Sequence, residues 1–210
     1  MAHRAQPKTH CHIERGHDFY ATPPEAVHAL LSVFRPPRLV WEPACGDGAI
    51  VNVLRAAGHD VIATDLNDWG CPDSTARVDF LMEREAPAGC HCIITNPPFR
   101  LAQQFAEHAL RLVPQVVMLC RLGFLESTRR TRLLEESGLQ YVFVFRNRLP
   151  MMHRYGWTGP RNSSSTAFAW YYWNREYSGE PRIIRISWTA NRSGAWPHAS
   201  RIGHPRSRYY

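Results

Sequence analysis

The sequence predicts an α/β fold in which a mostly parallel sheet is covered by helices. Short apolar runs alternate along the chain with segments of helical periodicity, which is the order expected of repeated strand–helix–strand units. With 210 residues, 44% of them hydrophobic, the chain can bury one sizeable core. We therefore expect one domain over residues 18–190, between a disordered basic leader at residues 1–17 and a flexible basic tail at residues 191–210.

The individual elements follow from periodicity and turn residues. Thr22 and Glu25 form a candidate capping box for a first helix that runs to about Phe34. Further helices are expected over residues 50–57 and 101–112, and from Ser127 to Gly138. Strands are predicted at Leu39–Trp41, Asp60–Asp65, Ala76–Phe80, His91–Thr95, Gln115–Leu122, Tyr141–Phe145 and Thr166–Trp173.

Charge and composition exclude some classes of function. The chain has 25 Lys and Arg against 18 Asp and Glu, and a net charge of +7 attracts polyanions, although an inert basic surface would have the same composition. Apolar runs such as Val116–Cys120 are far shorter than the roughly 20 residues that cross a bilayer, so no membrane segment is predicted. The six cysteines come without a secretory signal, which predicts the cytoplasm, or the host cytoplasm if the protein is phage-encoded. Cys90-His91-Cys92 lacks the paired spacing of a tetrahedral metal site, so no metal is predicted.

A glycine-containing turn after the first strand, from Glu42 to Gly48, is a candidate binding loop. Its glycines allow the backbone to approach a ligand closely, and the helix that begins there directs its amide groups at whatever lies above the strand. Asp65, at the end of the second strand, can accept hydrogen bonds from both hydroxyls of a ribose. Glu42 and Asp47 would repel a pyrophosphate and suit a cationic cofactor instead.

The tetrapeptide Asn96-Pro97-Pro98-Phe99 follows a buried apolar run, at the position where open α/β sheets bind their ligands. The two prolines stiffen the turn, and the Asn96 side-chain oxygen and the Pro97 carbonyl can both accept from one amine. A simple turn at the end of a strand would have the same features.

Together these segments resemble the amino-methyltransferases of nucleic acids, whose signature (Asp/Asn/Ser)-Pro-Pro-(Tyr/Phe/Trp) follows the fourth strand, and within them the small phage or bacterial N6-adenine DNA methyltransferases. The resemblance covers Phe19 to Trp173. It implies a Rossmann-like class I methyltransferase fold, with a seven-stranded sheet whose last strand is antiparallel, and S-adenosyl-L-methionine as cofactor. The residues it assigns to cofactor binding are Phe19, Tyr20, Thr22, Glu42, Ala44, Cys45, Gly46, Gly48, Asp65, Leu66, Asp79, Phe80 and Asn96.

The implied reaction is methyl transfer to the exocyclic N6 of adenine in DNA. The target base would be flipped out of the duplex, held at N6 by Asn96 and Pro97, and stacked on Phe99, so that the nitrogen lone pair points at the methyl group. The implied catalytic residues are Asn96, Pro97, Pro98 and Phe99. Cations and aromatic residues in the loop 146–165 suit a polynucleotide, although a structural lid would fit that composition equally well. The candidate substrate contacts are Phe99, Arg146, Arg148, Arg154, Tyr155, Trp157 and Arg161.

Several alternatives stay open at this point. Methylation of adenine in RNA, or of a protein glutamine amide, poses the same chemical problem, but Phe99 and the basic loop favour a nucleic acid. Cytosine enzymes more often begin the tetrapeptide with Ser. A non-catalytic nucleic-acid-binding module would be expected to have lost Asn96 or Asp65, and both are present. DNA is thus the expected partner, with RNA as the alternative, and a monomer and a homodimer are equally compatible with the sequence.

Overall fold

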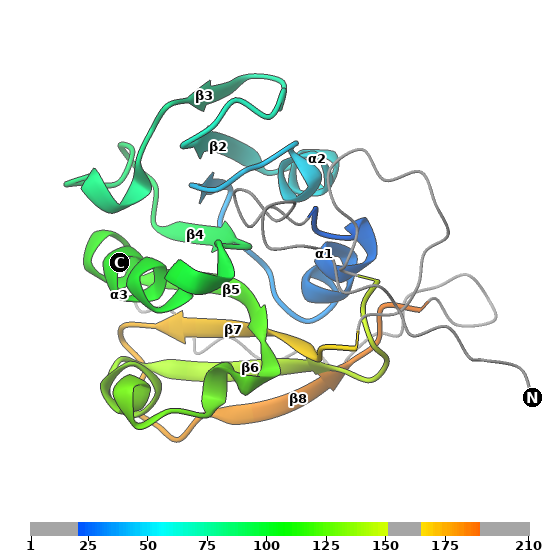
Figure 1. The fold of residues 1–210 in the computed structure, drawn as a ribbon, viewed down its shortest axis with the longest axis vertical. Helices are drawn as coiled ribbons and strands as arrows, with labels where there is room; N and C mark the ends of the chain where they lie inside the picture. Colours follow the sequence, from blue (N-terminus) through cyan, green and yellow to red (C-terminus); the bar gives the residue numbers. More distant parts are fainter. Residues whose placement is uncertain (1–20, 151–164, 190–210) are drawn as a thin grey trace, which may run out of the picture.

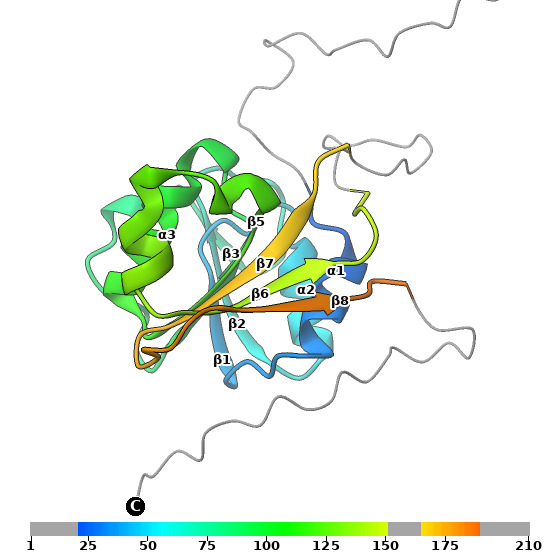
Figure 2. The same ribbon diagram turned by 90° about the horizontal axis from the view of Figure 1, so that it is seen from below.

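The computed structural model describes residues 21–150 and 165–189, which form an eight-stranded sheet with α-helices on both faces (Figure 1). The strand order is β3-β2-β1-β4-β5-β7-β6-β8. Every neighbouring pair is parallel except those of β7, which runs antiparallel to β5 and β6. The strands are β1 (Leu39–Glu42), β2 (Asp60–Asp65), β3 (Ser74–Ala76), β4 (Cys92–Thr95), β5 (Gln115–Arg121), β6 (Leu139–Phe145), β7 (Phe168–Asn174) and β8 (Arg182–Ile186). The predicted α/β fold, a mostly parallel sheet with helices on both faces, is confirmed (Figure 2).

The sheet has one strand more than predicted. β8 follows the antiparallel β7 and pairs in parallel with β6, from Tyr141 opposite Arg182 to Phe145 opposite Ile186. Among the side chains of β8 only Ile186 is buried, since the strand lies at the edge of the sheet. A strand that buries so little has a weak hydrophobic pattern, which explains why it is absent from the sequence prediction.

Two large hydrophobic cores form because alternate side chains of each strand point to opposite faces of the sheet, and a third, small cluster contains Cys45 and Cys71. In β5, Val117 and Leu119 belong to the core beneath α1 (Pro24–Leu31) and α2 (Ala49–Ala56). Val116 and Met118 belong to the core beneath α3 (Ala102–Leu112). Figure 2 shows α3 on one side of the sheet and α1 with α2 on the other. The β7 side chain of Trp170 also joins the layers, because its Nε1 donates to the carbonyl of Ala26 in α1 at 2.9 Å.

The start of α1 differs from the prediction. The helix has Pro23 at its N-cap and no side-chain cap, and it ends at Leu31 rather than near Phe34. The predicted capping box is therefore wrong. The Thr22 hydroxyl instead accepts a hydrogen bond from Asn96 of the tetrapeptide, as described below.

Two other predicted elements are shorter or irregular. The predicted strand Ala76–Phe80 is wrong except at its first residue, since β3 spans Ser74–Ala76 and Arg77 has a positive φ of 65° that interrupts an extended strand. The helix predicted from Ser127 to Gly138 is a 3₁₀ turn at Thr128–Arg130 followed by a π-helical turn at Arg132–Glu136. Arg130 donates to the carbonyls of Phe124 and Glu126, and these bonds hold the chain in a turn there.

Over residues 21–150 and 165–189, no helix is long and apolar enough to cross a membrane, and no cluster of three or more His, Cys, Asp or Glu side chains could hold a metal ion.

Candidate active site

A cavity of about 790 Å³ opens at the carboxyl ends of β1, β2, β4 and β5. The sheet order reverses between β1 and β4, which is where open α/β sheets bind ligands. Segments far apart in the sequence meet there, as predicted. The predicted residues that line the cavity are Thr22, Ala44, Cys45, Gly46, Asp65, Leu66, Asp79, Phe80, Asn96, Pro97, Pro98 and Phe99. Glu42 and Gly48 do not line it, and Phe19 and Tyr20 lie outside the described residues.

The glycine turn owes its shape to two positive φ angles, 55° at Gly46 and 89° at Gly48. The Cys45 amide donates to the Thr64 carbonyl at 3.0 Å, which joins the turn to the end of β2. A Cβ atom on Gly48 would lie 2.8 Å from Cys71 Sγ, closer than two such atoms can approach. Gly48 therefore packs against Cys71 on the side of the turn away from the cavity, while Gly46 lines the cavity.

Asp65 organises this side of the cavity. Its carboxylate accepts from the Gly46 amide at 2.9 Å, the Asn67 amide at 2.8 Å and the Trp69 indole at 3.1 Å. A carboxylate offers about four acceptor positions. The three protein donors leave room for one further donor, whereas the sequence predicts two ribose hydroxyls.

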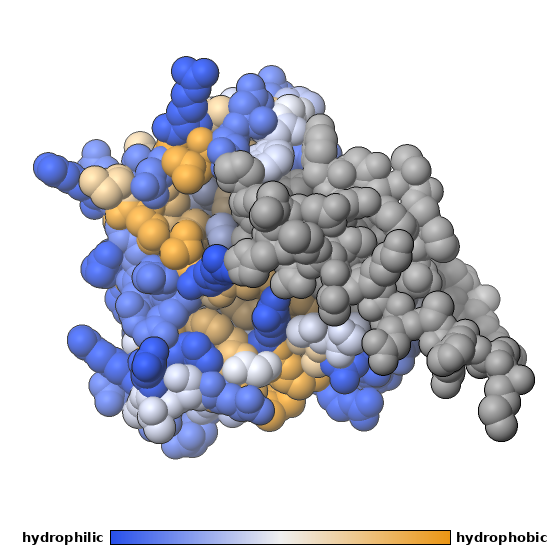
Figure 3. All heavy atoms as spheres, in the orientation of Figure 1, coloured by the Kyte–Doolittle hydropathy of each residue, from blue (hydrophilic) through white to orange (hydrophobic). Residues whose placement is uncertain are grey.

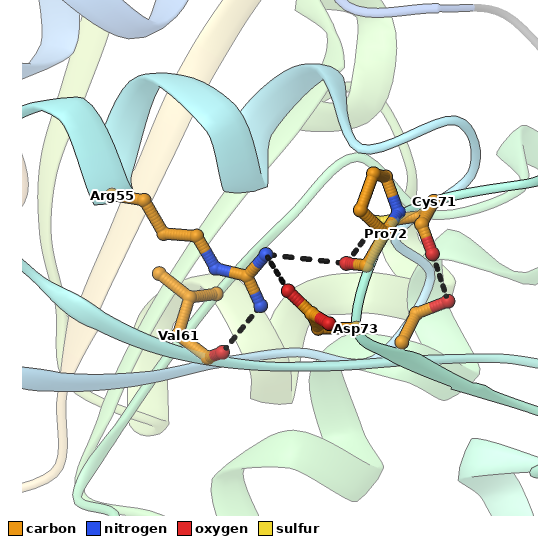
Figure 4. A network of polar contacts seen from close by, with 6 residues as sticks. Arg55, Val61, Cys71, Pro72 and Asp73 are labelled. Atoms are coloured by element: carbon orange, nitrogen blue, oxygen red, sulfur yellow. Dashed lines mark hydrogen bonds and ion pairs between the residues drawn. The ribbon is translucent and has the colours of Figure 1, made fainter.

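The loop after β2 is held by an arginine from α2. Figure 4 shows the Arg55 side chain extending toward Pro72 and Asp73 of this loop; it donates to the carbonyls of Pro72 and of Val61 in β2, both at 3.2 Å. Its guanidinium lies 3.8 Å from the carboxylate of Asp73, a residue with a positive φ of 56°. These contacts fix the segment that places Cys71 against Gly48, and that segment also contributes Leu66 and Trp69 to the cavity.

Phe80 forms an apolar wall of the cavity and is supported from behind. It is 2% exposed, and its ring meets those of Trp41, Phe105 and His108 at centroid distances of 4.8 to 5.3 Å. The Asp79 carboxylate accepts from the Leu81 amide at 3.0 Å, which turns the chain so that Asp79 and Phe80 both border the cavity. Burial, with the nearby Arg111 as the second cause, lowers the pKa of His108.

Glu42 is fully buried at the end of β1, beneath the glycine turn. Neither of its carboxyl oxygens has a hydrogen-bond partner within 3.5 Å among the described residues. Burial raises the pKa of Glu42 well above its ordinary value, although the nearby Thr95 hydroxyl and Ala44 backbone lower it in part. Burial of an unpartnered carboxyl group is costly and is more common at functional sites than elsewhere.

The tetrapeptide stands at the end of β4, as predicted. Asn96 Nδ2 donates to Thr22 Oγ1 at 3.1 Å. This bond fixes the orientation of the Asn96 carboxamide, with its nitrogen toward Thr22 and its oxygen, the acceptor, on the other side. Phe99 is partly exposed, and its ring lies 5.6 Å from the ring of Phe168 in β7. The guanidinium of Arg121, at the end of β5, lies over the Phe99 ring at 4.6 Å from its centroid.

Charges are segregated around the cavity. Asp47, Asp65 and Asp79 line the side formed by the glycine turn, β2 and the segment after β3, whereas Arg100 and Arg121 line the side next to Phe99. Apolar side chains remain exposed as well, with Leu66 at 58% and Leu101 at 36%. In the view of Figure 3, groups of hydrophobic side chains are visible at the surface among hydrophilic ones. The site thus offers a negative half, a positive half and apolar surface for planar rings.

Of the predicted substrate loop, the structure describes residues 146–150 and 165, and these do not line the cavity. Arg146 and Arg148 are exposed and do not line it. The other candidates in that loop, Arg154, Tyr155, Trp157 and Arg161, lie outside the described residues. Sequence reasoning missed Trp69, Arg100 and Arg121, which do line the cavity. The available signal was position, because Arg121 immediately follows the apolar run of β5 and Arg100 immediately follows Phe99.

Comparison with known proteins shows the fold. No protein-family model and no curated protein matches the sequence. The chain is similar to the modification subunit assigned to a type I restriction enzyme of Vibrio vulnificus YJ016, with TM-score 0.55 and 16% identity over 86% of this chain and 49% of that chain. It is similar to the type IIG restriction endonuclease BpuSI, with TM-score 0.54 and 14% identity over 82% of this chain and 28% of that chain. A Lactococcus lactis protein named as a hemolysin matches with TM-score 0.54 and 8% identity, over 76% of this chain and 91% of that chain.

The chain therefore spans about half of the first of these proteins and less than a third of the second. Identities this low show a common fold, and one fold hosts many functions. The strand order and the position of the cavity, at the reversal between β1 and β4, define a Rossmann-like α/β fold.

Proposed function

We propose that this protein is an S-adenosyl-L-methionine-dependent methyltransferase that modifies the exocyclic N6 of adenine in DNA. The observation that carries the proposal is the single cavity that joins the glycine turn, Asp65 and Asn96 to Phe99. Its volume of about 790 Å³ lies within the range of small-molecule sites. The fold shared with a restriction-enzyme modification subunit is compatible with a reaction on DNA. Such a reaction would take place in the cytoplasm.

The residues of the negative half fit this cofactor. S-adenosyl-L-methionine supplies an electrophilic methyl group on a positively charged sulfur when bound. Asp47, Asp65 and Asp79 suit a cationic ligand, and Asp65 retains one acceptor position for a ribose hydroxyl. Phe80 and the exposed Leu66 provide apolar surface for an adenine ring.

The tetrapeptide promotes methyl transfer by orienting the target amine. The Asn96 side-chain oxygen and the Pro97 carbonyl would accept hydrogen bonds from the two N–H groups of the target amine, and this directs the nitrogen lone pair out of the plane of the base. Thr22 holds the Asn96 carboxamide in the orientation that keeps its oxygen as the acceptor. Phe99 stacks on the base. A strong general base is not needed, because the lone pair would form the new nitrogen–methyl bond as the methyl–sulfur bond breaks, and the methylated amine, cationic at that point, would then release one proton to water.

The positive half favours a nucleic acid over a protein. Arg100 and Arg121 flank Phe99, where a flipped nucleotide brings its phosphates. A neutral glutamine side chain has no phosphate and would not need these two arginines at the edge of the cavity. RNA is the second candidate, since the same arginines and the same tetrapeptide serve adenine in either polymer.

Asn96→Ala tests the mechanism. Methyl transfer should fall below detection, while affinity for S-adenosyl-L-methionine measured by calorimetry should stay within about threefold, because the cofactor is held mainly by other residues. Asn52→Ala, at an exposed position on α2, is the matched control and should keep full activity. A variant at Asn96 with near-wild-type transfer would contradict the mechanism.

Substrate choice is tested separately. The wild-type protein is incubated with radiolabelled cofactor and, in parallel, duplex DNA, single-stranded DNA, RNA and bulk protein. Label should appear in DNA, as N6-methyladenine after digestion to nucleosides. Label found only in RNA or only in protein would replace the DNA assignment with that substrate.

A further inference from the structure

Phe99 divides two hollows of the surface. One is the main cavity, and the other is a smaller pocket lined by Phe99, Arg100 and Gln104 together with residues of α3 and of the turn after β5. Arg121 lines the main cavity and does not line the smaller pocket. The guanidinium of Arg121 lies over one face of the Phe99 ring, at 4.6 Å from the ring centroid, and Arg121 and Phe99 both line the main cavity, from which we infer that this is the face open to that cavity.

A base that stacks on Phe99 inside the main cavity needs that same face. Stacking of a base on an aromatic ring is generally stronger than an exposed cation–π contact, so a base can displace the guanidinium. Arg121 is exposed at the end of β5, and among the described residues no carboxylate lies within ion-pair distance of it. Among the described residues, the guanidinium of Arg121 has a cation–π contact with Phe99 and no ion pair. A displaced Arg121 is thus a free cation beside the bound nucleotide.

We propose that Arg121 covers the stacking face of Phe99 until the target nucleotide displaces it, and that it then binds the phosphate of that nucleotide. This inference rests on the proposed function, because it requires a nucleic acid as substrate. It assigns Arg121 two successive roles. It covers a partly exposed aromatic ring in the free protein, and it supplies a charge-assisted contact to the substrate backbone in the complex.

Salt dependence of binding tests the phosphate contact. Affinity for a fluorescently labelled single-stranded DNA oligonucleotide is measured by anisotropy over a series of salt concentrations. Each phosphate contact contributes about 0.7 to the slope of log affinity against log salt for a single strand. Arg121→Gln should lower the magnitude of the slope by about 0.7, and Arg121→Lys, which keeps the charge, should restore it.

Arg38→Gln is the matched control. It removes the same charge at the opposite end of the sheet, just before β1, where Arg38 forms an exposed ion pair with Asp60. Its slope should equal that of the wild type. An unchanged slope for Arg121→Gln, an equal loss for Arg38→Gln, or no oligonucleotide binding by the wild type would each overturn the inference.

Binding and methylation are measured separately, so the two failures can be told apart. If the wild type binds DNA but labels no nucleic acid, the proposed function fails while the slopes still decide the role of Arg121. A structure of the complex with an adenine-containing oligonucleotide tests the displacement itself. The base should lie over Phe99 with the Arg121 guanidinium on a phosphate, and a guanidinium that stays over the ring would overturn this part.

Discussion

The glycine turn leads to a prediction in which backbone strain and steric contact can be separated. Gly48 and Gly58 have nearly the same φ, 89° and 90°. A Cβ atom on Gly48 would lie 2.8 Å from Cys71 Sγ, whereas a Cβ atom on Gly58 would have nothing within 4 Å. Alanine at either position incurs the left-handed penalty of about 1–2 kcal/mol. Only Gly48→Ala adds overpacking, which costs about 1–3 kcal/mol more.

Urea unfolding provides the assay. Gly58→Ala should lower the free energy of unfolding by about 1–2 kcal/mol and Gly48→Ala by about 2–5 kcal/mol, with unchanged slopes against urea. Cys71→Ala removes the sulfur and leaves the Cys71 Cβ 3.6 Å from the new methyl group, an ordinary contact. In the Cys71→Ala background, the Gly48 substitution should therefore cost no more than the Gly58 substitution.

Two results would refute this reasoning. Equal losses of unfolding free energy for Gly48→Ala and Gly58→Ala would mean that the contact with the Cys71 sulfur does not affect stability. A Gly48→Ala loss that persists in the Cys71→Ala background would mean that the cause lies elsewhere in the turn. Cofactor affinity measured on the same proteins should fall for Gly48→Ala and stay unchanged for Gly58→Ala, because only Gly48 adjoins the turn that lines the cavity.

Further variants test the groups around the site. Thr22→Val removes the acceptor for Asn96 and should lower kcat about 2- to 12-fold at saturating substrates, from a hydrogen bond of about 0.5–1.5 kcal/mol, whereas Thr22→Ser should keep it; equal rates for both variants would contradict the role of the bond. Burial raises the pKa of Glu42, so the wild type loses stability as the pH rises above the unfolded value of about 4.3, and Glu42→Gln should flatten this loss and unfold at higher urea at pH 7. Burial is the first cause and the charge of Arg111 the second cause that lower the pKa of His108. The contribution of neutral His108 to the free energy of unfolding is therefore fully present above about pH 6.5 and is lost as the pH falls below that value. His108→Gln should weaken this dependence in urea midpoints measured from pH 5 to 7, and an unchanged profile would argue against it.

The strands of the sheet centre were predictable because their side chains are buried on both faces. The run Gln115–Leu122 was predicted and β5 spans Gln115–Arg121, with every side chain from Val116 to Cys120 buried. Hydrophobic burial on both faces produces a continuous apolar run, which is a strong local signal. The cavity was predictable for a related reason, since the ends of parallel strands must meet along one edge of the sheet.

Features that depend on distant contacts were not predictable. Thr22 and Asn96 are 74 positions apart, so the local pattern around Thr22 indicated a helix cap rather than a partner in the tetrapeptide. In the sequence, Arg121 is indistinguishable from an ordinary polar residue at the end of a strand, and only the fold shows that it lies over Phe99. The role of Asp65 was only half visible. Its position at the end of β2 was expected, but three protein donors, among them the Trp69 indole, already occupy its carboxylate.

The position of β7 has a consequence for the order in which the molecule can assemble. β7 lies between β5 and β6 in the sheet, although it follows both in the chain. It also anchors α1 through the bond from Trp170 to Ala26, which spans 144 positions. Contacts of such long range form late, because the loop must close before they stabilise anything. We therefore expect a nascent chain that has not yet produced β7 to lack a docked α1, and to acquire the complete cavity only once residues 168–174 have been synthesised and inserted.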